Sequence, residues 1–309
     1  MSRSSLAFAL SFFVFAGCAG AQPTAPNPAP VPRAAAPDKQ ITRVPSKDGT
    51  PIALECAGSG STLLIVHGGI GDRTRWTPML PLFSPRFTAC AMDRRGHGES
   101  GDSPDYSLQK EAEDIAAVVD SRPGNVFVLG HSYGGVAALE AALLTQKIAK
   151  LILYEPPVKD HAEASTIDRI EKSIQAGDRE QAVVTFLREV VKLSSKEVEA
   201  MRTRPPWRGM IAGIDAHPRQ MRALAAWHFD AKRIGNVRVP TLLVIGGDTR
   251  SPEMKDAIES LQESLPQPTL LVIEGEQHNA MDSARQKLAD GVTSFLLDNA
   301  HAEPAVIGH

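Results

Sequence analysis

Six short apolar runs, separated by longer segments of helical pattern, most constrain the fold of this 309-residue chain. They occupy residues 62–66, 87–92, 126–129, 151–154, 241–245 and 269–273. Continuous apolar runs of this length are typical of strands that are buried on both faces of a parallel sheet. Helical patterns lie between them at 107–120, 134–146, 253–263 and 282–299. The alternation predicts a doubly wound α/β sheet.

Two further strands and one long insertion complete this organisation. Residues 41–46 and 51–56 flank Asp48-Gly49, a pair typical of a hairpin turn. No strand-like run lies between Pro156 and Val237; the helix-forming segments there are 168–175, 181–191 and 219–228. An insertion of about eighty residues between two strands predicts a helical cap over one edge of the sheet. We expect a core at 38–156 and 237–300, with the cap at 157–236.

The first residues have the pattern of an export signal. Arg3 precedes the mostly apolar run 6–16, which small residues follow. That run is too short for a membrane-spanning helix, which needs about 20 residues, so we expect a signal peptide at 1–17. Phe15-Ala16-Gly17-Cys18 resembles the lipobox of bacterial lipoproteins, which implies cleavage before Cys18 and its acylation. The alternative is cleavage at Ala19-Gly20-Ala21, which would give a soluble exported protein.

The next segment predicts a tether. Of residues 19–37, 13 of 19 are Ala or Pro. Such a stretch cannot form a core and is expected to be an extended spacer over residues 18–37. We therefore expect a lipoprotein that is anchored to a membrane through Cys18 and faces the periplasm or the cell exterior; otherwise, the protein is soluble in the periplasm or secreted.

Charge and cysteine content exclude several classes. The net charge is −3 and the body has no basic cluster, which argues against a nucleic-acid partner. The three cysteines form no C-x-x-C pair, so neither a zinc framework nor a disulfide scaffold is supported, and we expect no metal.

A candidate nucleophile follows the run 126–129. Gly130-His131-Ser132-Tyr133-Gly134 matches G-x-S-x-G at a strand-to-helix turn. The glycines are needed because the serine occupies a strained turn, where neighbouring side chains would collide with strand and helix. We therefore expect Ser132 to be a nucleophile.

A serine hydroxyl needs a base, and the base needs an acid to orient it. His278 lies on the loop before the last helix, and Asp248 comes just after the run 241–245. In a parallel sheet these turns share the carboxyl edge, so distant residues can meet there. We expect His278 to be the base and favour Asp248 as the acid. Glu155, which directly follows the run 151–154, is the rival acid.

The negative charge that develops on a substrate carbonyl oxygen needs two backbone N–H donors. Tyr133, immediately after the nucleophile, can supply one. The other is expected from His67-Gly68-Gly69-Ile70-Gly71, with Gly69 as the choice. A dinucleotide-binding turn is excluded here, because Thr74 stands where that motif requires glycine.

Together these motifs resemble the α/β-hydrolase superfamily over residues 41–299. The resemblance rests on His67-Gly68-Gly69, the segment 93–100 (DRRGHGES), the serine turn, and the turns that carry Asp248 and His278. It implies an eight-stranded, mostly parallel sheet with helices on both faces and a helical cap after the sixth strand. It also implies hydrolysis without a cofactor, through an acyl-serine. The fold does not identify the substrate, because it hosts many reactions.

The expected function is hydrolysis of a carboxylic ester, thioester or lactone, with a small acyl compound as substrate. Alternatives on the same residues are C–C bond hydrolysis, amide cleavage and perhydrolysis of the haloperoxidase type. Dehalogenase and epoxide hydrolase chemistry are disfavoured, because those relatives carry Asp at the position of Ser132. A non-catalytic ligand-binding lipoprotein is the alternative from another class, although it would not require these residues. The sequence leaves the oligomeric state open.

Two groups of residues carry further expectations. In the cap, Trp207, Met210 and Trp227 are candidates to line an acyl pocket, although packing is the commoner role of such residues. Cys56 and Cys90 fall on strands that are neighbours in this fold. A disulfide between them suits an exported protein, but bonds between adjacent strands are geometrically difficult, so two buried thiols are the alternative.

Overall fold

The computed structural model describes residues 41–159, 162–266 and 268–298. The expected signal peptide (1–17), Cys18 and the tether (18–37) lie outside these residues. In the part of the chain that is described, no helix is both long and apolar enough to cross a membrane.

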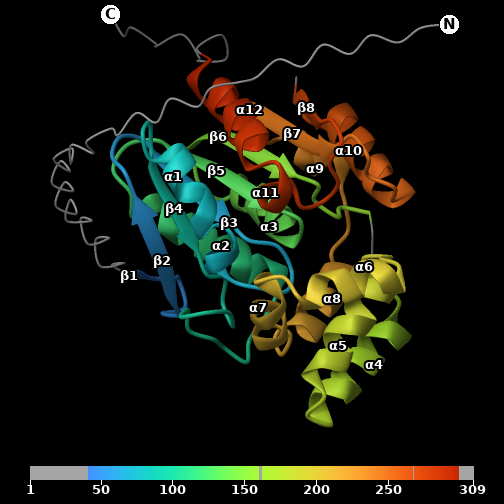
Figure 1. Cartoon of the computed structure of the whole chain (residues 1–309). Coiled ribbons are helices and arrows are strands. Elements are labelled where there is room, and N and C mark those ends of the chain that lie inside the picture. Colours follow the sequence, from blue (N-terminus) through green and yellow to red (C-terminus); the bar gives the residue numbers. More distant parts are fainter. Residues whose placement is uncertain (1–40, 160–161, 267, 299–309) are drawn as a thin grey trace, which may run out of the picture. The chain divides into compact units, whose positions relative to one another are not determined.

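An eight-stranded sheet organises the described chain, in the order β1-β2-β4-β3-β5-β6-β7-β8 (Figure 1). Strand β2 runs antiparallel to both of its neighbours, and every other pair is parallel. This confirms the expected sheet, including the initial hairpin. The strands are β1 (Ile41–Pro45), β2 (Pro51–Ala57), β3 (Thr62–Val66), β4 (Thr88–Met92), β5 (Val126–His131), β6 (Ile148–Tyr154), β7 (Thr241–Gly246) and β8 (Thr269–Ile273).

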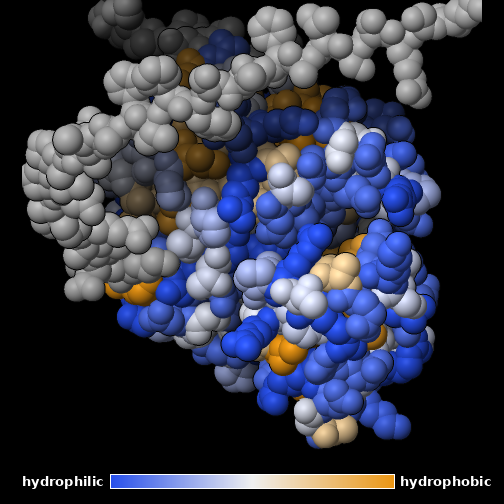
Figure 2. Space-filling model, viewed as in Figure 1, coloured by the Kyte–Doolittle hydropathy of each residue, from blue (hydrophilic) through white to orange (hydrophobic). Residues whose placement is uncertain are grey.

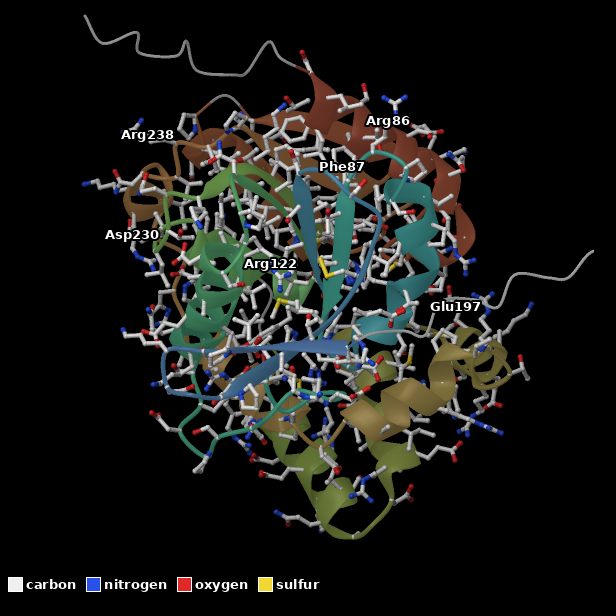
Figure 3. All side chains as sticks on the ribbon, turned by 90° about the vertical axis from the view of Figure 1, so that its left-hand side faces the viewer. Arg86, Phe87, Arg122, Glu197, Asp230 and Arg238 are labelled. Carbon is white, nitrogen blue, oxygen red and sulfur yellow. A yellow bond between two sulfur atoms is a disulfide. The ribbon has the colours of Figure 1, made fainter. Side chains whose placement is uncertain are left out.

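Helices cover both faces of the sheet, because alternate strand residues point to opposite sides. Leu64 and Val66 pack in one apolar cluster with α2 (Leu108–Asp120), α3 (Tyr133–Ala141) and α10 (Pro252–Ser264). Leu63 and Ile65 pack in a second cluster with α1 (Leu80–Phe83), α11 (Ala280–Ser283) and α12 (Arg285–Leu297). The second cluster also holds Phe87, just before β4, edge-on to Phe127 (Figure 3). The layered arrangement leaves the strand ends free to carry functional side chains.

Between β6 and β7 the described residues form only helices. They are α4 (Ala164–Gln175), α5 (Arg179–Thr185), a π-helical turn (Phe186–Val190), α6 (Ser195–Arg202), α7 (Pro206–Gly213), α8 (His217–Ala226) and α9 (Ala231–Ile234). Helices α4 to α8 form a group of their own beside the sheet (Figure 1). This group has its own apolar cluster, which includes Ile167, Ile170, Trp207 and Met210. Its outer face in Figure 2 is mainly hydrophilic, so the apolar residues are turned inward.

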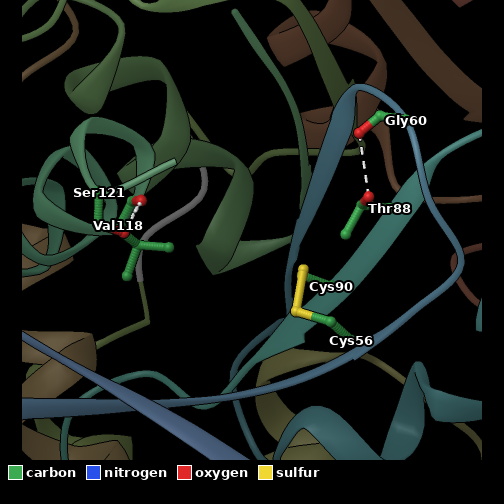
Figure 4. Close-up of a disulfide and its surroundings, with 6 residues drawn as sticks. All are labelled: Cys56, Gly60, Thr88, Cys90, Val118 and Ser121. Carbon is green, nitrogen blue, oxygen red and sulfur yellow. Dashed lines mark hydrogen bonds between the residues drawn. A yellow bond between two sulfur atoms is a disulfide. The ribbon is translucent and has the colours of Figure 1, made fainter. Parts of the chain in front are cut away.

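Cys56 and Cys90 form a disulfide (Figure 4). They lie directly opposite each other in the antiparallel β2–β4 pair, with Cα atoms 4.0 Å apart, so the two sulfur atoms meet despite the expected difficulty. Two free thiols are therefore ruled out in this structure. The bond closes a loop across 34 residues of sequence. A loop of that length is expected to stabilise the fold by about 4 kcal/mol, mainly through the unfolded chain.

Candidate active site

Ser132 lies in the sharp turn between β5 and α3. Its φ is 53° and its ψ is −127°, a strained conformation for a residue with a side chain. The Ser132 N–H donates to the carbonyl of Tyr154 at the end of β6, 2.9 Å away, which fixes the turn to the sheet. A Cβ at Gly134 would lie 2.3 Å from the His67 carbonyl oxygen. The turn therefore requires glycine where the motif has it.

His278 is bonded to Glu155, not to Asp248. Its Nδ1 lies 2.6 Å from Glu155 Oε2, whereas Asp248 is exposed beyond the end of β7. The preference for Asp248 was therefore wrong, and the rival residue occupies the place of the acid. The reason is local: Glu155 has a φ of 43°, and its own N–H is tied to the Val244 carbonyl. This bend directs the carboxylate along the sheet edge to the histidine.

The Glu155 carboxylate is buried, with only 1% of the residue exposed. Oε1 accepts hydrogen bonds from the Gly246 N–H and the Thr249 hydroxyl. Burial raises the pKa of Glu155, but its bonds to His278, Thr249 and Gly246 outweigh burial and hold the pKa below its ordinary value. The group is thus an anion at neutral pH, and His278 Nδ1 must donate the shared hydrogen. That leaves Nε2 of His278 as the free acceptor.

Two aromatic side chains hold the loop that carries His278. His131 Nε2 donates to the His278 carbonyl at 2.9 Å, and the two rings lie 4.6 Å apart. The Tyr154 hydroxyl donates to the Gln277 carbonyl and accepts from the Ala280 N–H. His131 ends β5 and Tyr154 ends β6, so the loop is positioned by the same strands as Ser132 and Glu155.

The glycine turn after β3 is oriented by charged and aromatic groups. Arg94 Nη2 donates to the carbonyl oxygens of Gly68 and Gly69, each at 2.9 Å, and His67 Nδ1 also donates to Gly68. Because C=O and N–H point in opposite directions across a trans peptide bond, the Gly69 N–H points away from Arg94. Tyr133 is the first residue of α3, so its N–H has no acceptor within the helix. The N–H groups of Gly69 and Tyr133 are thus both left without these partners, and their role as the oxyanion donors stays a prediction.

Arg94 also connects this turn to the cap. It is fully buried, pairs with Glu111 of α2 at 2.8 Å, and donates to Gln220 of α8 at 3.2 Å. His217, at the start of α8, lies against the turn: a Cβ on Gly69 would be 2.7 Å from its Cε1. Burial lowers the pKa of His217 to about 3, so its ring is neutral. Nothing in the local sequence indicates this contact, because His217 and Gly69 are about 150 residues apart in the chain.

A cavity of about 90 Å³ joins these groups. Ser132, His278, Gly68 and Gly69 line it on the core side, and Phe186, Leu187, Val191, Leu193, Met201 and Met210 line it on the cap side. It adjoins a wider cavity of about 510 Å³, and the two share Arg75 and Met210 among their lining residues. Ser132 and His278, which the sequence predicts to meet at the edge of the sheet, thus line the same cavity. Arg75, which also lines it, was not among the residues predicted from the sequence.

The three cap candidates differ in place. Met210 lines the cavity, as expected, whereas Trp207 lines a neighbouring hollow of about 300 Å³. Trp227 does not line the cavity: its indole N–H donates to Glu140 of α3 at 2.7 Å, and it packs against the core. An indole N–H needs an acceptor when buried, and Glu140 supplies it. Among the described residues, no cluster of His, Cys, Asp and Glu side chains is arranged to hold a metal ion.

Comparison with known proteins agrees with this fold. Residues 63–291 match the model of the alpha/beta hydrolase family. A 2-(acetamidomethylene)succinate hydrolase of Mesorhizobium japonicum is 23% identical over 77% of this chain and 89% of its own, and an esterase of Mycobacterium tuberculosis is 25% identical over 79% and 85%. The crystal structure of an alpha/beta hydrolase from Sphaerobacter thermophilus is 32% identical, has a TM-score of 0.75, and covers 82% of this chain and all of that chain.

Proposed function

This chain belongs to the α/β-hydrolase family and is a hydrolase, and on that premise we propose that it cleaves a carboxylic ester through an acyl-serine on Ser132. The observation that carries the proposal is the 2.6 Å contact between His278 Nδ1 and Glu155, next to the strained turn of Ser132. Thioesters and lactones present the same carbonyl chemistry. Hydrolysis of an amide or of a C–C bond is the alternative reaction on these residues. Because of the similar hydrolase of M. japonicum, an acylated enamine should be tested as a substrate together with the esters.

In the proposed reaction, Ser132 Oγ attacks the substrate carbonyl while His278 Nε2 takes its proton. The Glu155 carboxylate holds Nδ1–H and stabilises the imidazolium that forms. The N–H groups of Gly69 and Tyr133 donate to the oxyanion. His278 then gives its proton to the leaving alcohol. A water molecule then attacks the acyl-serine while His278 takes its proton. His278 returns this proton to Ser132 Oγ as the carboxylic acid leaves.

The small cavity favours a short acyl group. The space beside Ser132 is much narrower than the cavity that it adjoins, about 90 Å³ against about 510 Å³. Longer substrates must extend into this wider cavity. We therefore propose a short acyl group at the nucleophile, with the remainder of the substrate in the wider cavity.

We also propose that the protein is exported and anchored to a membrane by acylation of Cys18, with 18–37 as a tether. The Cys56–Cys90 disulfide supports an oxidising compartment, because such bonds are rare in the cytosol. Mass spectrometry of the mature N-terminus in its native host tests this: acylated Cys18 is expected, and a free N-terminus after Ala21 would contradict the anchor.

The test of the reaction is labelling with a fluorophosphonate, which reacts with activated serines. We expect the native protein to be labelled and Ser132→Ala and His278→Ala to stay unlabelled. Ser121→Ala is the matched control, because this serine lies at the end of α2 and donates to the Val118 carbonyl (Figure 4). If the folded native protein reacts with neither a bulky nor a small phosphonate, the acyl-serine mechanism is refuted.

A further inference from the structure

We propose that the substrate carries a carboxylate, which Arg75 binds at the junction of the catalytic cavity and the wider one. This inference rests on the proposed hydrolysis at Ser132 and names its substrate class. Arg75 comes from the 3₁₀ turn (Arg73–Arg75) that follows the oxyanion glycines, and it lines both cavities.

The guanidinium is held in place from one side. Nη2 of Arg75 donates to Asn279 Oδ1 at 3.0 Å and to Asp282 Oδ2 at 2.7 Å. Asn279 directly follows His278, so the loop of the base also fixes the cation. The Arg75 side chain is only 13% exposed. A preorganised cation at this place needs no reordering to bind a ligand.

Nη2 is the only nitrogen of this guanidinium that has a hydrogen-bond partner among the described residues. Nε makes no hydrogen bond there, but it is buried and closed to a ligand. Nη1 makes none there either and is not buried, so it is the donor that a ligand in the cavity can meet. A carboxylate would accept a charge-assisted bond from it, for which the planar guanidinium is suited.

The surroundings favour an anion over a neutral carbonyl. His67 and His131, which line the catalytic cavity, are neutral, because burial and the charge of neighbouring groups hold their pKa values well below the ordinary range. Asp72, the acidic residue in the lining, is engaged by the Thr74 N–H at 2.8 Å. Asp282 contacts only Nη2 of Arg75. The wider cavity is lined by three arginines, Arg75, Arg204 and Arg285, against two acidic residues, Asp72 and Asp282, so its lining carries a net positive charge.

The experiment compares matched esters with and without the charge. Monophenyl succinate is paired with methyl phenyl succinate, which places the carboxylate on the acyl side. Acetoxyacetate is paired with methyl acetoxyacetate, which places it on the alcohol side. In at least one pair we expect kcat/KM of the native enzyme to be about 10-fold or more higher for the anion. Arg75→Gln should lower that value by about 10- to 100-fold, as for a hydrogen bond to a charged group, and change the neutral ester by less than about threefold.

Two further variants separate charge recognition from a structural role of Arg75. Asp282→Asn keeps an oxygen that can accept the bond from Arg75 Nη2 but removes the competing negative charge. It should therefore raise the preference for the anion, whereas a fall would contradict the proposal. Arg86→Gln is the matched control, since Arg86 is exposed and lies just before β4 (Figure 3). It should leave kcat/KM unchanged for both the anionic and the neutral ester.

The outcomes also separate this inference from the proposed function. If the native enzyme cleaves neutral esters as well as or better than anionic ones, or if Arg75→Gln lowers both equally, the carboxylate site is refuted and the hydrolase stands. If no ester is cleaved and Ser132 resists fluorophosphonate, the proposed function itself fails.

Discussion

Glu155→Gln should lower kcat on a neutral short-chain ester by about 10³- to 10⁴-fold, whereas Asp248→Asn should leave it within about threefold of the native value. The hydrogen bonds of Glu155 explain the size of this effect. Its Oε1 accepts from both the Gly246 N–H and the Thr249 hydroxyl, so the oxygen of a glutamine is drawn to that place. The amide NH₂ then faces His278 Nδ1, which must become the acceptor. The ring adopts the wrong tautomer, with its hydrogen on Nε2.

The pair of variants is informative because the residues differ in burial and contact. Kinetics should be combined with the rate of fluorophosphonate labelling, since that rate reports activation of Ser132 without later steps. Circular dichroism and thermal unfolding establish that both variants are folded. If Glu155→Gln kept a near-native kcat and Asp248→Asn lost most of it, the assignment of the acid would be reversed to Asp248.

Acidification from pH 7 to pH 5 should lower the free energy of unfolding by several kcal/mol. Burial holds the pKa values of four histidines, His67, His97, His131 and His217, well below their ordinary range. Below about pH 6.5 the unfolded chain binds protons that these folded histidines do not bind, so stability is lost as the pH falls. Each contributes about 2 kcal/mol over this interval, or at most about 8 kcal/mol together.

Some carboxyl groups act in the opposite sense and reduce the total. Burial raises the pKa values of Asp93 and Asp114, although their arginine partners lower them in part, so the folded chain takes up protons there more readily. Urea unfolding at pH 7, 6 and 5 measures the balance. His217→Gln should reduce the pH dependence by about one proton, and the exposed His228→Gln is the control that should not. A pH-independent free energy would contradict neutral, buried histidines.

The sheet could be predicted from the sequence because its signal is local. The strands at 62–66 and 269–273 have the expected bounds, since their apolar residues are contiguous and bounded by turns. Ser132 was recognisable for the same reason, because glycine is required on both sides of its turn. These features depend on the backbone within a few residues.

The carboxylate that contacts His278 was harder to predict from the sequence, because two carboxylates follow neighbouring strands. Both Glu155 and Asp248 lie beyond the carboxyl end of a strand, and the choice depends on a positive φ at Glu155 that its residue type does not indicate. The direct attachment of Glu155 to the end of β6 was the available signal. Trp227 and Arg75 show the same limit, since Glu140 and Asn279, which they contact, are distant in sequence.

The cap reaches the proposed chemistry through the oxyanion turn. The contacts described for Glu155 and for the His278 ring come from core strands and loops, whereas Gly69 lies against His217 and shares Arg94 with Gln220. Substitutions in the cap outside α8 can therefore alter substrate specificity while Glu155 and His278 keep their positions. Divergence to new substrates is easiest in the cap away from α8, and the first turn of α8 is where such divergence would impair turnover.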